Sequence, residues 1–330
     1  MLAAAVVVVL AIPDWIPRLN QGVVFGMIML SLVLLTGYAG QVSLAQMTFV
    51  GLGAFAMGNY FGGASVWGIV LAAVFSGAVG AIAALPALRL QGLYLALSTL
   101  AFAQAMITLF FNNENVFGFG GRLAVGRPTI LGISTSGDRA FFIFTCVCFA
   151  MAGVGVLALR RGPFGRRLVA MRDSPAACAT LGLNLTFTKL SVFAASSALA
   201  GVAGVLYGGL RGQVGPTDFE MLQSLVLLLL VSISGIHTVT GALMGGLTFG
   251  LFPTFQRWFP SLRSLPFLGA GLGALAIGRN PNGWTSDLAP IGDRLRAAWR
   301  GTAPPGPPVA GDTPPDTESE EVRELAGATR

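Results

Sequence analysis

Few side chains in this 330-residue sequence could carry out catalysis or bind a metal. Its one lysine, Lys189, lies outside any Gly-Lys-Ser/Thr sequence of the kind with which a Walker A loop holds nucleotide phosphates. Its one histidine, His237, has no cysteine or second histidine beside it, and Cys146, Cys148 and Cys178 lack the spacing of a metal site or a disulfide framework. We therefore expect no catalytic residue, no metal site and no cofactor in this chain.

The side chains that do stand out are cations. Five arginines fall within thirteen positions of a chain that is only 10% charged: Arg160, Arg161, Arg166, Arg167 and Arg172. Guanidinium groups gathered between two apolar segments have two interpretations. They hold this segment on the cytoplasmic face of a membrane by the positive-inside rule, or they bind a partner protein there.

The residues after this basic run predict a short helix of small side chains. Asp173 or Ser174 is predicted to cap its N-terminus, and Pro175 suits its first helical position. Gly182 is predicted to end it as a left-handed C-terminal cap. Ala176 and Ala177 lie between them and leave one side of the helix small enough to fit a groove on another protein.

The rest of the chain has the composition of a membrane protein. It is 54% hydrophobic with a mean hydropathy of +0.74, whereas soluble proteins are about 25% charged. Apolar runs approach the roughly 20 residues that cross a bilayer and do not alternate as barrel strands do. We predict an all-α, polytopic integral membrane protein of about eight to ten transmembrane helices, at residues 2–12, 22–36, 44–61, 66–88, 93–111, 140–159, 190–209, 222–237, 241–259 and 264–278.

The cations lie in connections beside these segments, which fits membrane topology better than nucleic-acid binding. We predict a transmembrane domain over residues 1–285, with 160–189 as a cytoplasmic coupling loop. Residues 286–330 form a cytoplasmic tail, proline-rich, acidic and disordered from about residue 302. The N-terminus is also cytoplasmic in this topology, and a retained signal anchor is the alternative for the short first segment.

Three stretches resemble the permeases of branched-chain amino acid ABC transporters, in particular the LivM-type subunit. They are TGYAGQVSLAQMTFVGLGAFAMGNY (36–60), LPALRLQGLYLALSTLAFAQ (85–104) and RDSPAACATLGLNLTFTKLSVFAASSALAGVAGVLYG (172–208), in the order and spacing of that family. The third resembles the cytoplasmic segment that couples such a permease to its motor. The residues expected to make this coupling are Arg166, Arg167, Arg172, Asp173, Ser174, Ala176, Ala177 and Gly182.

The resemblance implies a subunit of an ATP-binding-cassette importer in the plasma (inner) membrane of a prokaryote. It implies amino acids as substrates, branched-chain aliphatic by default, with urea, amides or aromatic acids as the alternative. It also implies four kinds of partner: a paralogous, LivH-like permease subunit, two cytoplasmic ABC ATPase subunits that bind the ATP, an extracytoplasmic solute-binding protein, and the small-molecule substrate.

The sequence departs from the family in two places. Pro175 stands where the family usually has an acidic residue near the start of the coupling helix. FGGRLAVGRP (119–128) replaces a glycine-serine-aspartate-glycine stretch and has no aspartate. If that stretch helps to select the substrate, the substrate differs from an ordinary branched-chain amino acid.

Polar groups and glycines inside the first two stretches are candidates for the translocation pathway. In a membrane such groups face protein or water, and glycines allow broken helices that bind substrate. The candidates are Gly37, Gly40, Gln41, Ser43, Gln46, Tyr94, Thr99 and Gln104. Hydrogen bonding and close packing between helices are the alternative explanation for each of them.

The energy source separates three hypotheses. None of the predicted spans contains the pair of Asp, Glu or His residues expected of a proton relay. This favours an external ATPase over a secondary transporter that uses an ion gradient alone. A membrane scaffold that transports nothing is the third hypothesis.

Overall fold

The computed structural model describes residues 15–61, 65–87, 90, 92–117, 121–129 and 135–258. The chain divides into two compact units, Met1–Thr285 and Ser286–Arg330, and every described residue belongs to the first. The predicted spans 2–12 and 264–278 and the predicted tail lie outside the described residues.

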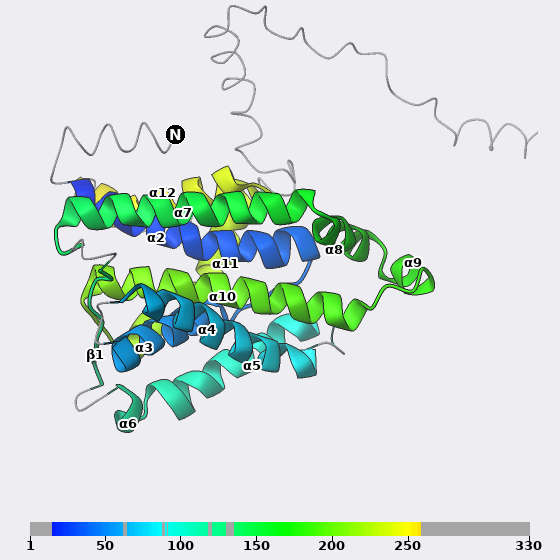
Figure 1. Ribbon diagram of the computed structural model, residues 1–330, viewed down its shortest axis with the longest axis horizontal. Coiled ribbons are helices and arrows are strands. Elements are labelled where there is room, and N and C mark those ends of the chain that lie inside the picture. The colour runs from blue at the N-terminus through cyan, green and yellow to red at the C-terminus, as the bar shows by residue number, and fades with distance from the viewer. Residues whose placement is uncertain are drawn as a thin grey trace, which may run out of the picture. The chain divides into compact units, whose positions relative to one another are not determined.

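The described residues form a helical bundle (Figure 1). Its longer helices are α2 (Ile16–Leu32), α3 (Gln46–Phe61), α4 (Val66–Ala87), α5 (Leu93–Met106), α7 (Asp138–Arg161), α8 (Pro163–Asp173), α10 (Leu185–Arg211), α11 (Met221–Gly235) and α12 (Val239–Trp258). Its shorter helices are η2 (Val33–Tyr38), η3 (Ile107–Phe111), α6 (Glu114–Phe117), α9 (Pro175–Thr180) and η4 (Pro216–Phe219). Two short strands, β1 (Leu123–Ala124) and β2 (Gln213–Val214), pair antiparallel.

Six helical segments are long and apolar enough to cross a membrane: Ile16–Tyr38, Val66–Leu85, Tyr94–Phe111, Asp138–Arg161, Leu185–Arg211 and Pro216–Gly235. This confirms the predicted all-α, polytopic membrane architecture. The larger predicted number of spans includes two segments outside the described residues. It also includes α3, whose 16 residues fall short of a bilayer's width, and α12, whose apolar part Val239–Thr254 is likewise short.

α2 and α10 form the centre of the bundle. α2 packs against α7, α10 and α12, and α10 packs against α3 and α4 (Figure 1). In an 18-residue apolar stretch of the span Ile16–Tyr38, which comprises α2 and η2, 89% of the residues are buried. In the corresponding stretch of α10, 61% are buried. The corresponding stretches of α4, α5, α7 and α11 are only about a third buried or less. These four helices therefore each present a face to the surroundings of the chain.

Small residues let the central helices approach closely, as is usual in membranes. A side chain at Gly53 of α3 would overlap the carbonyl oxygen of Gly201 on α10, and one at Gly204 would overlap that of Val50. At the contact between α2 and α12, a side chain at Gly246 would overlap the backbone of Gly26. The many glycines thus have a packing role at the two contacts that hold the bundle together.

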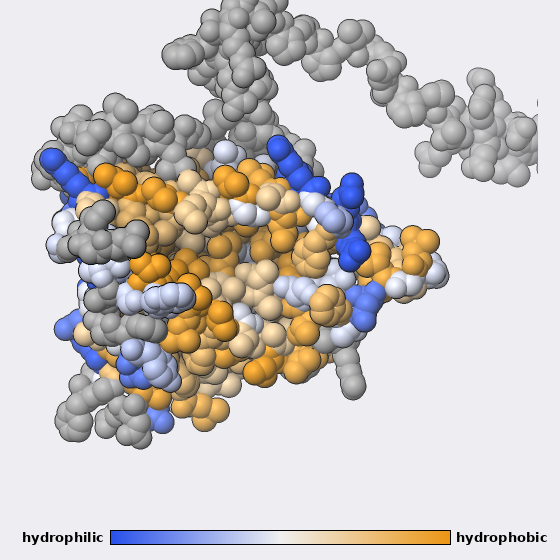
Figure 2. All heavy atoms as spheres, viewed as in Figure 1, coloured by the Kyte–Doolittle hydropathy of each residue, from blue (hydrophilic) through white to orange (hydrophobic). Residues whose placement is uncertain are grey.

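The two ends of the bundle are polar and its middle is apolar (Figure 2). At one end, β1 and β2 pair, Arg127 forms an ion pair of 2.7 Å with Asp138, and Arg211 forms one of 3.3 Å with Asp218. At the other end, α8 and α9 project beyond the long helices (Figure 1). An apolar band between two charged ends is the surface expected of a chain that spans a bilayer.

Candidate functional site

The helices break between the first described span, Ile16–Tyr38, and α3, inside the stretch predicted to line a pathway. The helix widens into the π-helix η2 and ends in the turn at Gly40, whose φ of +66° favours glycine. α3 begins only at Gln46. A side chain at Gly40 would come within 2.6 Å of the Cγ atom of Arg172, so this position has no room for one. The segment from η2 to the start of α3, called the broken helix below, has its turn against the end of α8.

Buried hydrogen bonds tie the far side of this break to two other helices. The Gln46 side chain is fully buried, and its Nε2 donates to the hydroxyls of Ser31 and Ser196, each at 2.8 Å. The Ser196 hydroxyl donates in turn to the Ser31 carbonyl at 2.7 Å. Gln46 therefore links α3 to α2 and α10, which supports the packing explanation for this residue.

Thr99 on α5 is bound to the same break. Its hydroxyl accepts from the Leu44 amide at 3.0 Å and donates to the Ala96 carbonyl at 2.9 Å. The buried Ser43 hydroxyl accepts from the Ala45 amide at 3.3 Å. The break is therefore held between α5 on one side and the pair α2 and α10 on the other.

The basic run is helical, which corrects the expectation of a loop over its whole length. α7 continues to Arg161, and α8 begins at Pro163 after Gly162. α8 buries Leu168 and Met171 at i, i+3 spacing and leaves Arg166 and Arg167 exposed. The signal that was missed is this amphipathic spacing, together with a proline at the first helical position.

The short helix after it follows the predicted pattern. The Ser174 hydroxyl caps α9 by accepting from the Ala177 amide at 3.4 Å, and Gly182 has a φ of +77° just beyond the helix. Ala176 and Ala177 are exposed. Asp173, the other predicted cap, is the last residue of α8 and pairs with Arg172 at 3.1 Å instead.

The Gly37 carbonyl oxygen joins the basic helices to the break. Arg172 Nη1 donates to it at 2.9 Å, and His237 Nδ1 lies 3.1 Å from it, in the connection between α11 and α12. The guanidinium of Arg160, at the end of α7, lies 5.3 Å from the centre of the Tyr38 ring. Burial, with a further contribution from the charges of Arg172 and Arg160, lowers the pKa of His237 below its usual value. The neutral imidazole can therefore donate from Nδ1 to this carbonyl.

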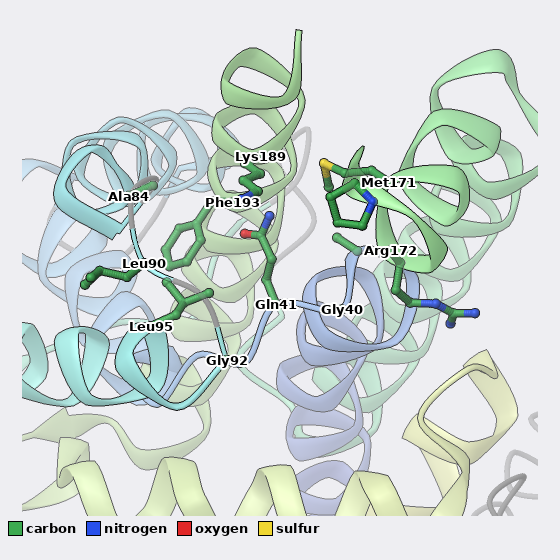
Figure 3. Close-up of a pocket in the computed structure, with 12 residues that line it drawn as sticks. Gly40, Gln41, Ala84, Leu90, Gly92, Leu95, Met171, Arg172, Lys189 and Phe193 are labelled. Atoms are coloured by element: carbon green, nitrogen blue, oxygen red, sulfur yellow. The ribbon is translucent and has the colours of Figure 1, made fainter. Parts of the chain in front are cut away.

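A pocket of about 180 Å³ opens between the break, α5, α8 and α10 (Figure 3). Its polar lining consists of Gln41, Arg172 and Lys189. Two predicted pathway residues, Gly40 and Gln41, thus meet one predicted coupling residue, Arg172. Lys189 was not among the residues predicted to line the pathway. Among the described residues, no three His, Cys, Asp or Glu side chains come together as a metal site would require.

Tyr94 and Gln104 are not brought to this pocket. Both lie on the exposed face of α5, and Thr108, in η3 directly after α5, is exposed as well. The exposed face in the middle of α7 is apolar and includes Ile143, Val147 and Met151, whereas the exposed side of α5 carries Gln104 beside apolar residues such as Leu97. A polar amide such as that of Gln104 on the outside of a span belongs against protein or water and not against lipid.

Comparison with known proteins agrees with this architecture. The family model described as "Branched-chain amino acid transport system / permease component" matches residues 17–274. The chain is 31% identical over 233 residues to the high-affinity branched-chain amino acid transport system permease protein LivM of Salmonella typhimurium, covering 62% of this chain and 55% of that protein. It is 28% identical over 281 residues to the LivM of Escherichia coli, covering 77% of this chain and 66% of that protein.

The chain therefore spans between about half and two thirds of the length of these two relatives. No solved structure matches it significantly.

Proposed function

Because this chain belongs to the family of the branched-chain amino acid transport system permease component, we propose that it is a membrane-spanning subunit of an ATP-binding-cassette importer. It has no enzymatic activity of its own, and separate ATPase subunits supply the energy. Its membrane is the plasma (inner) membrane of a prokaryote, and α8, α9 and both termini lie on the cytoplasmic side.

The observation that carries this proposal is the shared Gly37 carbonyl. α8 and α9 project from the bundle with small or basic side chains exposed, as a docking element would. The last turn of α8 is attached to the π-helix through Arg172 and Gly37. A motor that pushes on α9 would therefore move α8, and α8 would move the turn at Gly40 against which Arg172 packs.

The exposed face of α5 supports a second permease as a partner. A strip of polar and small residues is exposed on the span Tyr94–Phe111. It consists of Ala101, Gln104, Ala105 and Thr108. A second helical subunit packed there would remove Gln104 from lipid and place it at the interface between the subunits. Tyr94, on the same exposed face, then also lies at this interface.

The remaining partners follow from the family. Two cytoplasmic ATPase subunits bind the ATP, and an extracytoplasmic solute-binding protein delivers the substrate at the end that carries β1 and β2. The substrate class is amino acids, branched-chain aliphatic by default.

Reconstitution tests the proposal. The chain, its partner permease and the ATPases are inserted into liposomes, and uptake of labelled leucine, isoleucine and valine from the binding protein is measured with and without ATP inside. ATP-dependent uptake is expected. Uptake by this chain alone, driven by a proton or sodium gradient, would reject the proposal in favour of a secondary transporter.

The docking element is tested by co-purification with the ATPase subunits. We expect Gly182→Pro, or the pair Arg166→Glu and Arg167→Glu, to abolish co-purification. The matched control is Arg122→Glu, an exposed charge reversal at the opposite end of the bundle. Equal co-purification of all these variants, or labelling of residues 160–189 from outside the cell, contradicts the assigned role of α8 and α9.

A further inference from the structure

The pocket beside the Gly40 turn has a donor that nothing in the described chain satisfies. The Gln41 side chain is 6% exposed, and its Nε2 atom is buried with no hydrogen-bond partner among the described residues. A buried amide left unpaired costs about 1–3 kcal/mol. In Figure 3 the Gln41 side chain extends from the Gly40 turn toward Lys189. An occupant of the pocket would supply the missing acceptor.

Lys189 supplies a positive charge to the same space. It lies one turn inside α10, lines the pocket and is half-buried, and it forms no ion pair with any described residue. Arg172 contributes less, because its guanidinium is bound to Gly37 and Asp173 and points away from the pocket (Figure 3). None of the described lining residues is acidic. The pocket therefore offers hydrogen-bond donors and one available cation to an anion.

The opposite wall is apolar and the volume is small. Leu90, Leu95, Met171 and Phe193 line the pocket together with Ala84 and Pro175. Its volume of about 180 Å³ lies below the roughly 300–1,000 Å³ of pockets for drug-sized ligands. A suitable occupant is a small molecule with an anionic head and an aliphatic or aromatic body.

We infer that this pocket binds the carboxylate of the transported molecule, with Lys189 Nζ and Gln41 Nε2 as donors and Leu95 and Phe193 against its apolar body. The inference rests on the proposed function, since it identifies the occupant as the substrate. Recognition centres on the carboxylate, because the described lining holds no acidic side chain for an ammonium group. A bound substrate would touch the broken helix and α8 at once, the two elements that Arg172 joins.

Direct binding to the purified full-length chain tests the site without ATP or ATPase. The probes are tritiated leucine, 4-methyl-2-oxopentanoate and phenylacetate, which share a carboxylate and an apolar body. Unlabelled leucinamide, which lacks the carboxylate, and inorganic phosphate serve as competitors. At least one carboxylate probe is expected to bind at millimolar concentration or below, and leucinamide and phosphate are expected not to compete.

The variants are Lys189→Met and Gln41→Leu, which keep the size of each side chain. Each removes a charged or charge-assisted hydrogen bond, so the Kd of the bound probe should rise roughly 10- to 100-fold. Lys189→Arg should retain most of the affinity. Arg139→Met, an exposed cation removed at the far end of α7, should leave the Kd unchanged. A thermal unfolding midpoint close to that of the natural chain shows that each variant is folded.

Four results overturn the inference: no binding of any carboxylate probe to the natural chain, displacement by leucinamide, displacement by phosphate, or an unchanged Kd in folded Lys189→Met. Loss of ATPase co-purification in Lys189→Met with unchanged probe binding would also overturn it, because the lysine would then bind the partner. The proposed function fails separately, if the assembled natural transporter shows no ATP-dependent uptake.

Discussion

Replacing Arg172 by methionine should uncouple ATP hydrolysis by the partner ATPases from substrate transport through this chain. Methionine keeps an unbranched stem that can still pack against the Gly40 turn, but it removes the donor to the Gly37 carbonyl. After the change, His237 is left as the side chain bonded to this oxygen. Arg139→Met is the control, since Arg139 is an exposed arginine at the opposite end of the bundle, away from the basic helices.

The expected loss follows from the contacts of Arg172. A hydrogen bond from a charged donor contributes about 1.5–3 kcal/mol. The Arg172 side chain is 34% exposed, so solvent screens part of this. Its pairing with Asp173, itself 60% exposed, adds little. We therefore expect Arg172→Met to lower the free energy of unfolding by about 1–2 kcal/mol, or the Tm by roughly 2–8 °C, and Arg139→Met to leave both unchanged.

The functional assay compares ATP hydrolysis and substrate uptake in the reconstituted transporter. If this hydrogen bond transmits the movement of α8 to the broken helix, its loss should lower uptake per ATP hydrolysed by about 5- to 30-fold, the equivalent of 1–2 kcal/mol of coupling. Hydrolysis itself should continue. An equal drop in uptake for Arg139→Met and Arg172→Met, or unchanged coupling in folded Arg172→Met, would refute the reasoning that this contact transmits the movement.

Three further predictions concern the core and the break. Gly201→Ala should lower the Tm because its new methyl group meets Ser76 and the Ala72 carbonyl, with a cost of about 1–3 kcal/mol, whereas Gly155→Ala, in open space on α7, should leave it unchanged or raise it; equal Tm values would contradict the close packing. His237 has a lowered pKa when folded, so the unfolded chain takes up the proton first as pH falls below about 6.5; stability measured by denaturation should drop from pH 7 to 5 in the natural chain and drop less in His237→Gln, and an unaltered pH profile would contradict this. Gln46→Leu removes a donor from the buried hydroxyls of Ser31 and Ser196 and should lower the free energy of unfolding by about 1–3 kcal/mol in the same denaturation measurement. No change in stability would show that the Gln46 amide does not stabilise the bundle.

The parts of the fold that follow local rules could be predicted from sequence. Ser174 and Pro175 before α9, and Gly182 after it, are positions where backbone geometry and hydrogen bonding restrict the choice of residue. The membrane class followed equally directly from the long apolar segments. α8 was missed because its basic residues, Arg166, Arg167 and Arg172, mask the i, i+3 spacing of Leu168 and Met171.

The contacts of the site could not be predicted in the same way. Arg172 and His237 reach the Gly37 carbonyl across 135 and 200 positions of sequence, and no local rule relates them. The exposed face of α5 depends on which of its sides other helices cover, so the sequence placed Gln104 and Thr99 together while the structure puts them on different faces. Lys189 likewise becomes part of a pocket only when α10 lies beside the break.

The central place of α2 has a consequence for biosynthesis. Most of its surface is covered by α7, α10 and α12, whose sequences leave the ribosome long after its own. The 207 positions between Leu32 and Val239 take about 10–40 s to translate. During that interval Asn20 and Ser31, both buried in the finished bundle, stay without their final neighbours in the insertion machinery or the lipid. A chain truncated before α12 therefore exposes α2, the most buried of the described spans, and quality-control proteases should recognise it there.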